Sequence, residues 1–172
     1  MSINDKLNSL LSGGDLRSIG RANEIVKLIY TQEDFDILFG YLYCDNRLIV
    51  MKAADSIEKI SRKQNSFLKM HKESIFELIK NAKDKEQKWH LAQLSSKLEL
   101  NDHEKNAIFE LLIVWLKNKN ESKIVRVNSI QALSEICANS ELLRKRLDTI
   151  LNGIEKENIP SINARIRKLK EG

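Results

Sequence analysis

The chain has 172 residues, a formal net charge of +5 at pH 7 and charged side chains at 31% of its positions. This length favours one domain with a sizeable core, and 6% aromatic residues with a single proline favour a helix-rich protein over a β-sandwich or a disordered chain. No apolar run approaches the ~18 residues of a membrane span, and the start lacks the pattern of a secretory signal. We therefore expect one cytoplasmic domain over residues 1–172.

The first predicted helix, residues 2–12, is followed by the glycine-rich stretch SGGDLRSIGRA. A phosphate-binding P-loop has four residues between its two glycines and then Lys and Ser or Thr. Here five residues separate Gly14 from Gly20, and Arg-Ala follows. We therefore interpret the glycine pair as a helix end and Asp15 as the N-cap of a second helix over residues 15–30. The alternative is a helix N-terminus that binds an anion with neighbouring arginines.

The rest of the chain repeats one pattern with a period near 37 residues. Leu42, Ile79, Leu116 and Ile154 occupy matching places, with separations of 37, 37 and 38. Apolar residues recur every three or four positions within each segment, which is the period of a helix and not of a strand. The pattern predicts five helix pairs, with helices at residues 2–12 and 15–30, 33–44 and 47–62, 66–81 and 86–99, 102–118 and 122–138, and 140–156 and 160–171.

Helix start signals agree with three of these boundaries. Asp102 precedes the apolar stretch HEKNAIFELL, and Ser140 precedes ELLRKRL. Both are residue types that accept hydrogen bonds from the free N–H groups of a first turn. Pro160 stands at the expected start of the last helix, where its missing N–H is no loss.

A period near 37 with two helices per unit is typical of a right-handed α-solenoid, and the units resemble HEAT repeats. The first helix of that repeat ends in Leu-x-Asp, and the second opens with Val-Arg and carries an alanine further in. The stretches LYCDNRLIVMKAA and NESKIVRVNSIQAL follow the pattern, but only Val125-Arg126 keeps the Val-Arg pair. Met51 and His90 replace the arginine elsewhere. The resemblance implies an all-α, right-handed α-α superhelix of about five antiparallel helix pairs.

The whole chain is also similar to a group of small HEAT-repeat proteins without an assigned function. The segments SGGDLRSIGRANEIV, KAADSIEKISRK, KWHLAQL and INARIRKL carry this similarity. It implies a fold and brings no activity with it.

Residues that would carry catalysis or bind a metal are sparse. The three histidines fall in different repeats without metal-ligand spacing, and the one His-Glu pair, His103-Glu104, falls at a helix start, where acidic side chains are favoured. HEAT-like hydroxylases, in contrast, carry repeated His-Glu pairs. Cys44 and Cys137 lie far apart and are interpreted as reduced thiols. No nucleophile motif is present, so we expect no enzyme, no metal and no cofactor.

The two tryptophans are interpreted as core residues. Trp115 lies within an apolar helix, and Trp89 holds a place that valine takes in two other repeats; its neighbour His90 is expected to point outward. Some DNA glycosylases that remove alkylated bases also have a HEAT-like fold, with tryptophans, an aspartate and basic residues on the concave face. Asp55, Trp89 and Arg126 would take these roles, although no motif requires it.

Charge is distributed unequally between the two helices of each pair. The predicted second helices sum to +7 and the first helices to −2. The second helices line the concave face in HEAT solenoids, so the inner layer is predicted to be basic. It would suit a phosphate backbone or an acidic protein segment. Nearly half of the +7 comes from the last helix, which also fits a solvated end cap.

These features predict a non-enzymatic scaffold that recognises a protein partner through its concave face. The alternative is a nucleic-acid-binding protein, remotely a glycosylase-like one, which requires the arginines and lysines to lie on one continuous face. No membrane association and no particular oligomeric state is predicted. The candidate binding residues on the concave face are Arg17, Arg21, Lys52, Asp55, His90, Arg126, Arg165 and Arg167.

Overall fold

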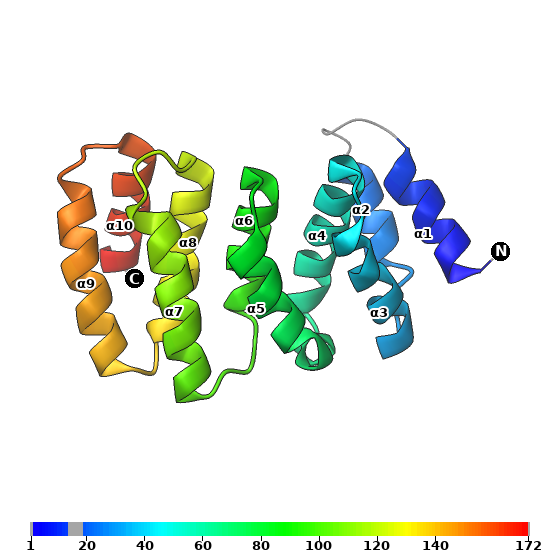
Figure 1. The fold of residues 1–172 in the computed structure, drawn as a ribbon, viewed down its shortest axis with the longest axis horizontal. Helices are drawn as coiled ribbons and strands as arrows, with labels where there is room; N and C mark the ends of the chain where they lie inside the picture. The colour runs from blue at the N-terminus through cyan, green and yellow to red at the C-terminus, as the bar shows by residue number, and fades with distance from the viewer. Residues whose placement is uncertain (1, 14–18, 172) are drawn as a thin grey trace. The chain divides into compact units, whose positions relative to one another are not determined.

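The computed structural model describes residues 2–13 and 19–171, which form α-helices joined by short turns (Figure 1). Within these residues there is no strand, and no helix is long and apolar enough to span a membrane. The chain divides into two compact units, Met1–His71 and Lys72–Gly172. The all-helical prediction is confirmed, whereas a single domain over residues 1–172 stays a prediction.

The first unit begins with two helix pairs. In chain order, it contains α1 (Ile3–Ser12), α2 (Ile19–Val26), α3 (Gln32–Gly40), the short 3-10 helix η1 (Tyr41–Tyr43), α4 (Arg47–Ser61) and the 3-10 segment η2 (Asn65–His71). α4 packs against α1, α2 and α3. Its inward face carries Ala53, Ala54, Ile57 and Ile60, all of which are buried, as their helical spacing requires.

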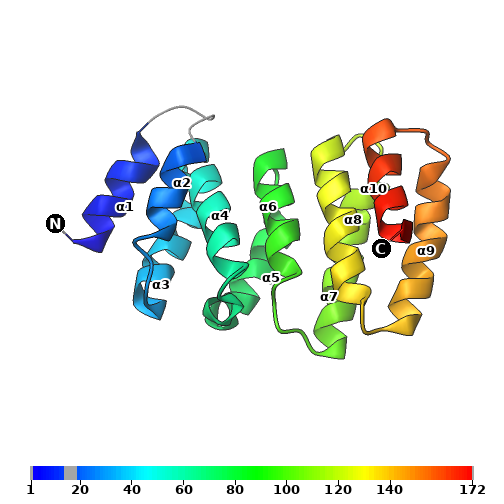
Figure 2. The same cartoon turned by 180° about the vertical axis from the view of Figure 1, so that it is seen from behind.

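The second unit contains three helix pairs. These are α5 (Lys72–Asn81) with α6 (Lys85–Ser95), α7 (Asp102–Lys117) with α8 (Lys123–Cys137), and α9 (Glu141–Glu155) with α10 (Pro160–Glu171). The second helices α6, α8 and α10 pack side by side in one layer, and the first helices α5, α7 and α9 form the other (Figures 1 and 2).

Local capping explains several helix starts. Thr31 accepts a hydrogen bond from the Asp34 amide at 3.1 Å, and the Asp34 carboxylate accepts from the Thr31 amide at 3.0 Å. This reciprocal capping box satisfies two N–H groups that a helix start leaves free. Asn101, and not the predicted Asp102, caps α7, with Glu104 returning the bond. The predictions of Ser140 as a cap and Pro160 as a first helical residue are confirmed.

The predicted helix over residues 66–81 is divided in two. Residues 65–71 form the 3-10 segment η2, and the α-helix α5 starts only at Lys72. Within the first unit, the Phe67 ring lies 5.3 Å from the Phe35 ring, and the Phe67 carbonyl accepts a hydrogen bond from Gln32 at 3.1 Å. These tertiary contacts hold η2 against α3, which periodicity alone does not indicate.

The glycine-rich stretch near the start is only partly described. α1 ends at Ser12, and Gly13 follows in an extended conformation, which confirms the predicted helix end. Gly14, Asp15 and Arg17 lie outside the described residues. α2 ends at Val26, four residues before the predicted boundary.

The repeat register is confirmed by burial. Leu42, Ile79, Leu116 and Ile154, the residues that defined the period, are all buried. Trp115 is buried as predicted. Each pair therefore turns the same face of its first helix inward, as expected when stacked helix pairs share a core.

Candidate functional site

Lys52, on α4 of the first unit, was predicted to face a ligand but is a buried cation. It is 6% exposed, and its ammonium group donates hydrogen bonds to the backbone carbonyls of Leu11, at 3.3 Å, and of Gly13. These carbonyls lie where α1 ends, and a helix leaves its last C=O groups without intrahelical partners. A cation is also favoured there by the helix dipole. Lys52 therefore fastens α4 to the end of α1.

Arg126, on α8 of the second unit, is buried even more deeply, at 1% exposed. Its Nε donates to the Leu116 carbonyl at 2.8 Å, and Nη2 pairs with the Glu157 carboxylate at 2.8 Å. A charge removed from water needs such partners because its desolvation is costly. Arg126 thus connects α8 to the end of α7 and to the turn after α9. Its position corrects the prediction that it lines a ligand-binding face.

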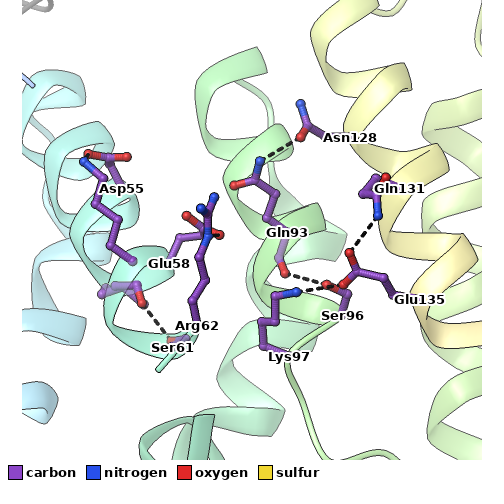
Figure 3. A network of polar contacts seen from close by, with 12 residues as sticks. Asp55, Glu58, Ser61, Arg62, Gln93, Ser96, Lys97, Asn128, Gln131 and Glu135 are labelled. Atoms are coloured by element: carbon purple, nitrogen blue, oxygen red, sulfur yellow. Dashed lines mark hydrogen bonds and ion pairs between the residues drawn. The ribbon is translucent and has the colours of Figure 1, made fainter. Parts of the chain in front are cut away.

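Among the residues of the first unit that the structure describes, the other predicted candidates form no cationic row. Arg21, on α2, places its guanidinium against Gly13, where a Cβ would stand. Asp55 is half-buried on α4 and pairs with Lys59 at 2.8 Å. One turn further along α4, Glu58 pairs with Arg62 at 2.5 Å (Figure 3).

The burial of His90 and Trp89 is the reverse of what the sequence predicted. His90 is 1% exposed, so the prediction that it points outward is wrong, and Trp89 keeps part of its surface in solvent. The two ring centroids are 3.4 Å apart. A glycosylase-like trio of Asp55, Trp89 and Arg126 gains no support, because Arg126 is buried and bound to Glu157.

The last helix carries the predicted inner-layer cations that are exposed in the second unit. Arg167 and Lys168 are exposed on α10. Arg165 is half-buried and donates to the side-chain carbonyl of Gln131 at 2.9 Å. Of the basic residues predicted for the inner layer, those exposed in the second unit therefore form a short cationic end on α10.

A row of polar side chains that charge counting did not reveal connects α6 to α8. Gln93 on α6 donates to the Asn128 side chain on α8 at 2.7 Å, and one turn further Lys97 pairs with Glu135 at 2.7 Å (Figure 3). Burial is the largest influence on the Glu135 pKa and raises it. Hydrogen bonds from Lys97, Gln131 and Ser96 outweigh burial and hold that pKa below its usual range.

The same row continues to α10. Gln131 donates to the Glu135 carboxylate at 2.9 Å, and its own carbonyl oxygen accepts the bond from Arg165. Donors and acceptors therefore alternate from Lys97 through Glu135 and Gln131 to Arg165, and the Gln93–Asn128 pair lies beside this series. A charge count does not detect uncharged amides. The 35-residue separation of Gln93 and Asn128 is close to the repeat period, however, and this spacing could have indicated their pairing.

Apolar residues extend this row toward the helix starts. Ile124 precedes Asn128 by one turn on α8 and is 46% exposed, and Trp89 precedes Gln93 by one turn on α6. Residues three or four apart share a helix face, so the same stripes carry apolar and polar groups. We call this surface the second-helix face, and it comprises Trp89, Gln93, Lys97, Ile124, Asn128, Gln131, Glu135 and Arg165.

The second-helix face carries side chains of the types found in protein interfaces. Carboxamides each offer two donors and an acceptor with two lone pairs, and a partly exposed tryptophan is a common anchor in protein interfaces. In the part of the chain that the structure describes, no group of three or more His, Cys, Asp and Glu side chains is arranged to hold a metal ion.

A family model described as a HEAT repeat domain matches residues 5–171. No curated protein and no solved structure matches the chain.

Proposed function

Because the chain belongs to the HEAT-repeat family, we propose that it is a non-enzymatic scaffold that recognises a protein partner through the second-helix face. Rigid repeated helices present extended surfaces that suit such recognition and need no catalytic group. The observation that carries the proposal is the pair of cross-helix bonds, one from Gln93 to Asn128 and one from Arg165 to Gln131. It presents neutral donors and acceptors already held in place.

An extended polypeptide fits this arrangement. Packed helices lie roughly 8–10 Å apart, and an extended chain rises about 3.3 Å per residue. A segment crossing α6, α8 and α10 would therefore meet a new helix about every third residue. The carboxamides of Asn128 and Gln131 match the donors and acceptors of its backbone, whereas the Gln93 carbonyl oxygen is buried. Trp89 and Ile124 offer apolar contact beside them.

Affinity capture with matched variants tests the proposal. Ile124→Lys places a charge on the second-helix face, and Leu142→Lys makes the same kind of change on α9, where Leu142 is 70% exposed. We expect a protein retained by the natural chain and by Leu142→Lys to be lost by Ile124→Lys. A purified partner should then show at least about 10-fold weaker binding to Ile124→Lys in calorimetry. Equal retention by all three chains would contradict the proposal.

Nucleic acid is the second candidate because Arg167 and Lys168 remain exposed on α10. Lys52 and Arg126 are unsuitable for charge reversal because both are buried, and reversing buried cations would unfold the chain. The suitable variant is Arg167→Glu with Lys168→Glu, measured by fluorescence anisotropy with labelled single- and double-stranded oligonucleotides at low and near-physiological salt. Affinity that survives the higher salt, falls steeply with it and is lost in the variant would favour nucleic acid. Absence of binding at both salt concentrations would favour the protein partner.

A further inference from the structure

The first-helix layer of the second unit carries a groove on the side of the molecule that the proposed function does not use. α6 packs extensively against α8, whereas their partners α5 and α7 contact each other sparsely. Between α5 and α7 lies a pocket of about 700 Å³. Its apolar lining comes from Phe76 on α5 and from Ala107, Leu111 and Val114 on α7.

The groove follows a straight face of α7. His103, Ala107, Leu111 and Val114 recur at spacings of four, four and three, which places them on one side of the helix. At 1.5 Å per residue this face is roughly 16 Å long, or three helical turns. Val114 is 66% exposed although it lies in a core-forming helix. An exposed β-branched apolar side chain in a groove is one that a bound partner would cover.

The rim of the groove is acidic on both sides. Glu73 and Glu77 stand on α5 and Glu110 on α7, and all three are exposed. Glu73 and Glu77 are four residues apart on one helix, where like charges repel each other. A cation held over them by a partner would relieve this repulsion.

The two lysines of the rim are already paired. Lys72 donates to both carboxylate oxygens of Glu104 at 2.9 Å, and Lys80 pairs with Glu77 at 2.8 Å. The lining as a whole has four glutamates and two lysines, and Glu110 pairs with Arg146 on α9 at 2.7 Å. A small excess of negative charge therefore faces an incoming ligand.

We propose that the α5–α7 groove binds a basic amphipathic helix of a partner protein. Its apolar side chains, at helical spacing, contact Phe76, Leu111 and Val114, and its flanking lysines or arginines face Glu73, Glu77 and Glu110. A helix suits the groove because two neighbouring helices admit the ridge of a third between them. A helix also satisfies its own backbone hydrogen bonds, and the walls of the groove are helices without a free strand edge.

A second copy of this chain is a poorer occupant. Its most basic helix, α10, already uses the apolar residues Ile162 and Ile166 in its own core, where both are buried. Such a helix would have to leave its own core before it could enter the groove of another copy. The occupant is therefore a helix from a different protein.

Peptide display on the full-length protein tests the proposal. The probe is a phage library of 16-residue peptides, selected on the natural chain and counted against Val114→Lys and Leu142→Lys. We expect peptides that bind the natural chain and Leu142→Lys but not Val114→Lys. Their sequences should combine Leu, Ile, Met or Phe at spacings of three and four with an excess of Lys and Arg. Because Val114 and Leu142 are both exposed, circular dichroism should show that both variants fold.

Charge reversal on the rim then separates electrostatic recognition from apolar contact. For a selected peptide made synthetically, Glu73→Lys should weaken binding at least about 10-fold, whereas Lys80→Glu should leave it equal or tighter. Raising the salt concentration should weaken binding as well. Three results would overturn the proposal: no peptide that depends on Val114, selected peptides with an excess of acidic residues, or a dimer of the chain that Val114→Lys dissociates.

Discussion

Each unit contains a buried cation on a second helix, and the two cations bond to different kinds of group. In the first unit the Lys52 ammonium bonds to backbone carbonyls where α1 ends. In the second unit Arg126 bonds to a carbonyl near the end of α7 and also to the Glu157 carboxylate. Both cations stand near the start of a second helix and fasten it to the end of a first helix. In the second unit a partner with a full charge, Glu157, therefore depends on the cation.

Contacts between successive repeats also differ in chemistry between the two units. The first unit uses aromatic packing, with His71 stacked on Phe39 at 3.9 Å and bonded to Asp36 at 2.6 Å. The second unit uses ion pairs such as Lys88 with Glu121, at 2.5 Å. Contacts between successive repeats can therefore be stabilised by different chemistry, and substitutions at such contacts should have unequal effects.

The largest effect is expected for Arg126→Met. The substitution leaves the partly buried Glu157 carboxylate without its cation and the Leu116 carbonyl without its donor. Breaking a buried pair in this way lowers the free energy of unfolding by about 3–5 kcal/mol, as urea unfolding followed by circular dichroism should show. Adding Glu157→Leu should restore part of the loss, since no charge is then stranded. A loss below about 1 kcal/mol would show that the pair contributes little.

The cysteines provide one probe in each unit. Cys44, in the first, is exposed, and Cys137, in the second, is buried. Burial raises the pKa of the Cys137 thiol to about 11, which lowers its thiolate fraction at pH 8 about 100-fold. We expect one fast and one slow reaction with a disulfide reagent that releases a coloured thiolate. Cys44→Ser should remove the fast phase and Cys137→Ser the slow one, and two equal fast phases would contradict the buried position of Cys137.

Lys52→Met should have an intermediate effect. It leaves the carbonyl groups of Leu11 and Gly13 at the end of α1 without a donor, so the expected loss is about 1–3 kcal/mol in the same urea unfolding measurement. Lys59→Met is the control, because Lys59 lies on the same helix and pairs with Asp55 nearer the surface. A loss as large as that of Arg126→Met would remove the distinction between the units.

The smallest effect is expected for Glu135→Gln. Because the pKa of Glu135 is lower in the folded chain than in the unfolded one, its ionised form stabilises the fold above the unfolded pKa, and this stabilisation is lost as the pH falls through the folded pKa. The pair with Lys97 is partly exposed, so the loss at pH 7 should be below about 1 kcal/mol. The difference between the variant and the natural chain should disappear near pH 3. A difference that persists there would show that packing, and not charge, is responsible.

Much of the fold could be predicted because helices carry their signals locally. The predicted helix over residues 102–118 corresponds to α7 at Asp102–Lys117, and that over residues 122–138 to α8 at Lys123–Cys137. Caps and apolar periodicity lie within a few residues of each boundary. η2 is the exception, because contacts with Phe35 and Gln32 on another helix accompany its tighter winding.

Less of the candidate site could be predicted. A charge count treats every lysine and arginine as a surface group, but Lys52 and Arg126 are buried. The amides of Gln93, Asn128 and Gln131 were overlooked because they carry no charge. Trp89 and His90 are neighbours, and only packing decided that the histidine is the buried one.

The sequence by itself determined the helices, their pairing and the repeat, because spacing along one chain sets which residues share a helix face. The sequence also identifies the family, because the HEAT repeat domain model matches residues 5–171. The tertiary structure decided which polar side chains meet, as in Gln93 with Asn128 and Arg126 with Glu157. Such contacts join residues about thirty or more positions apart, and whether a charge is buried depends on the helix that packs over it.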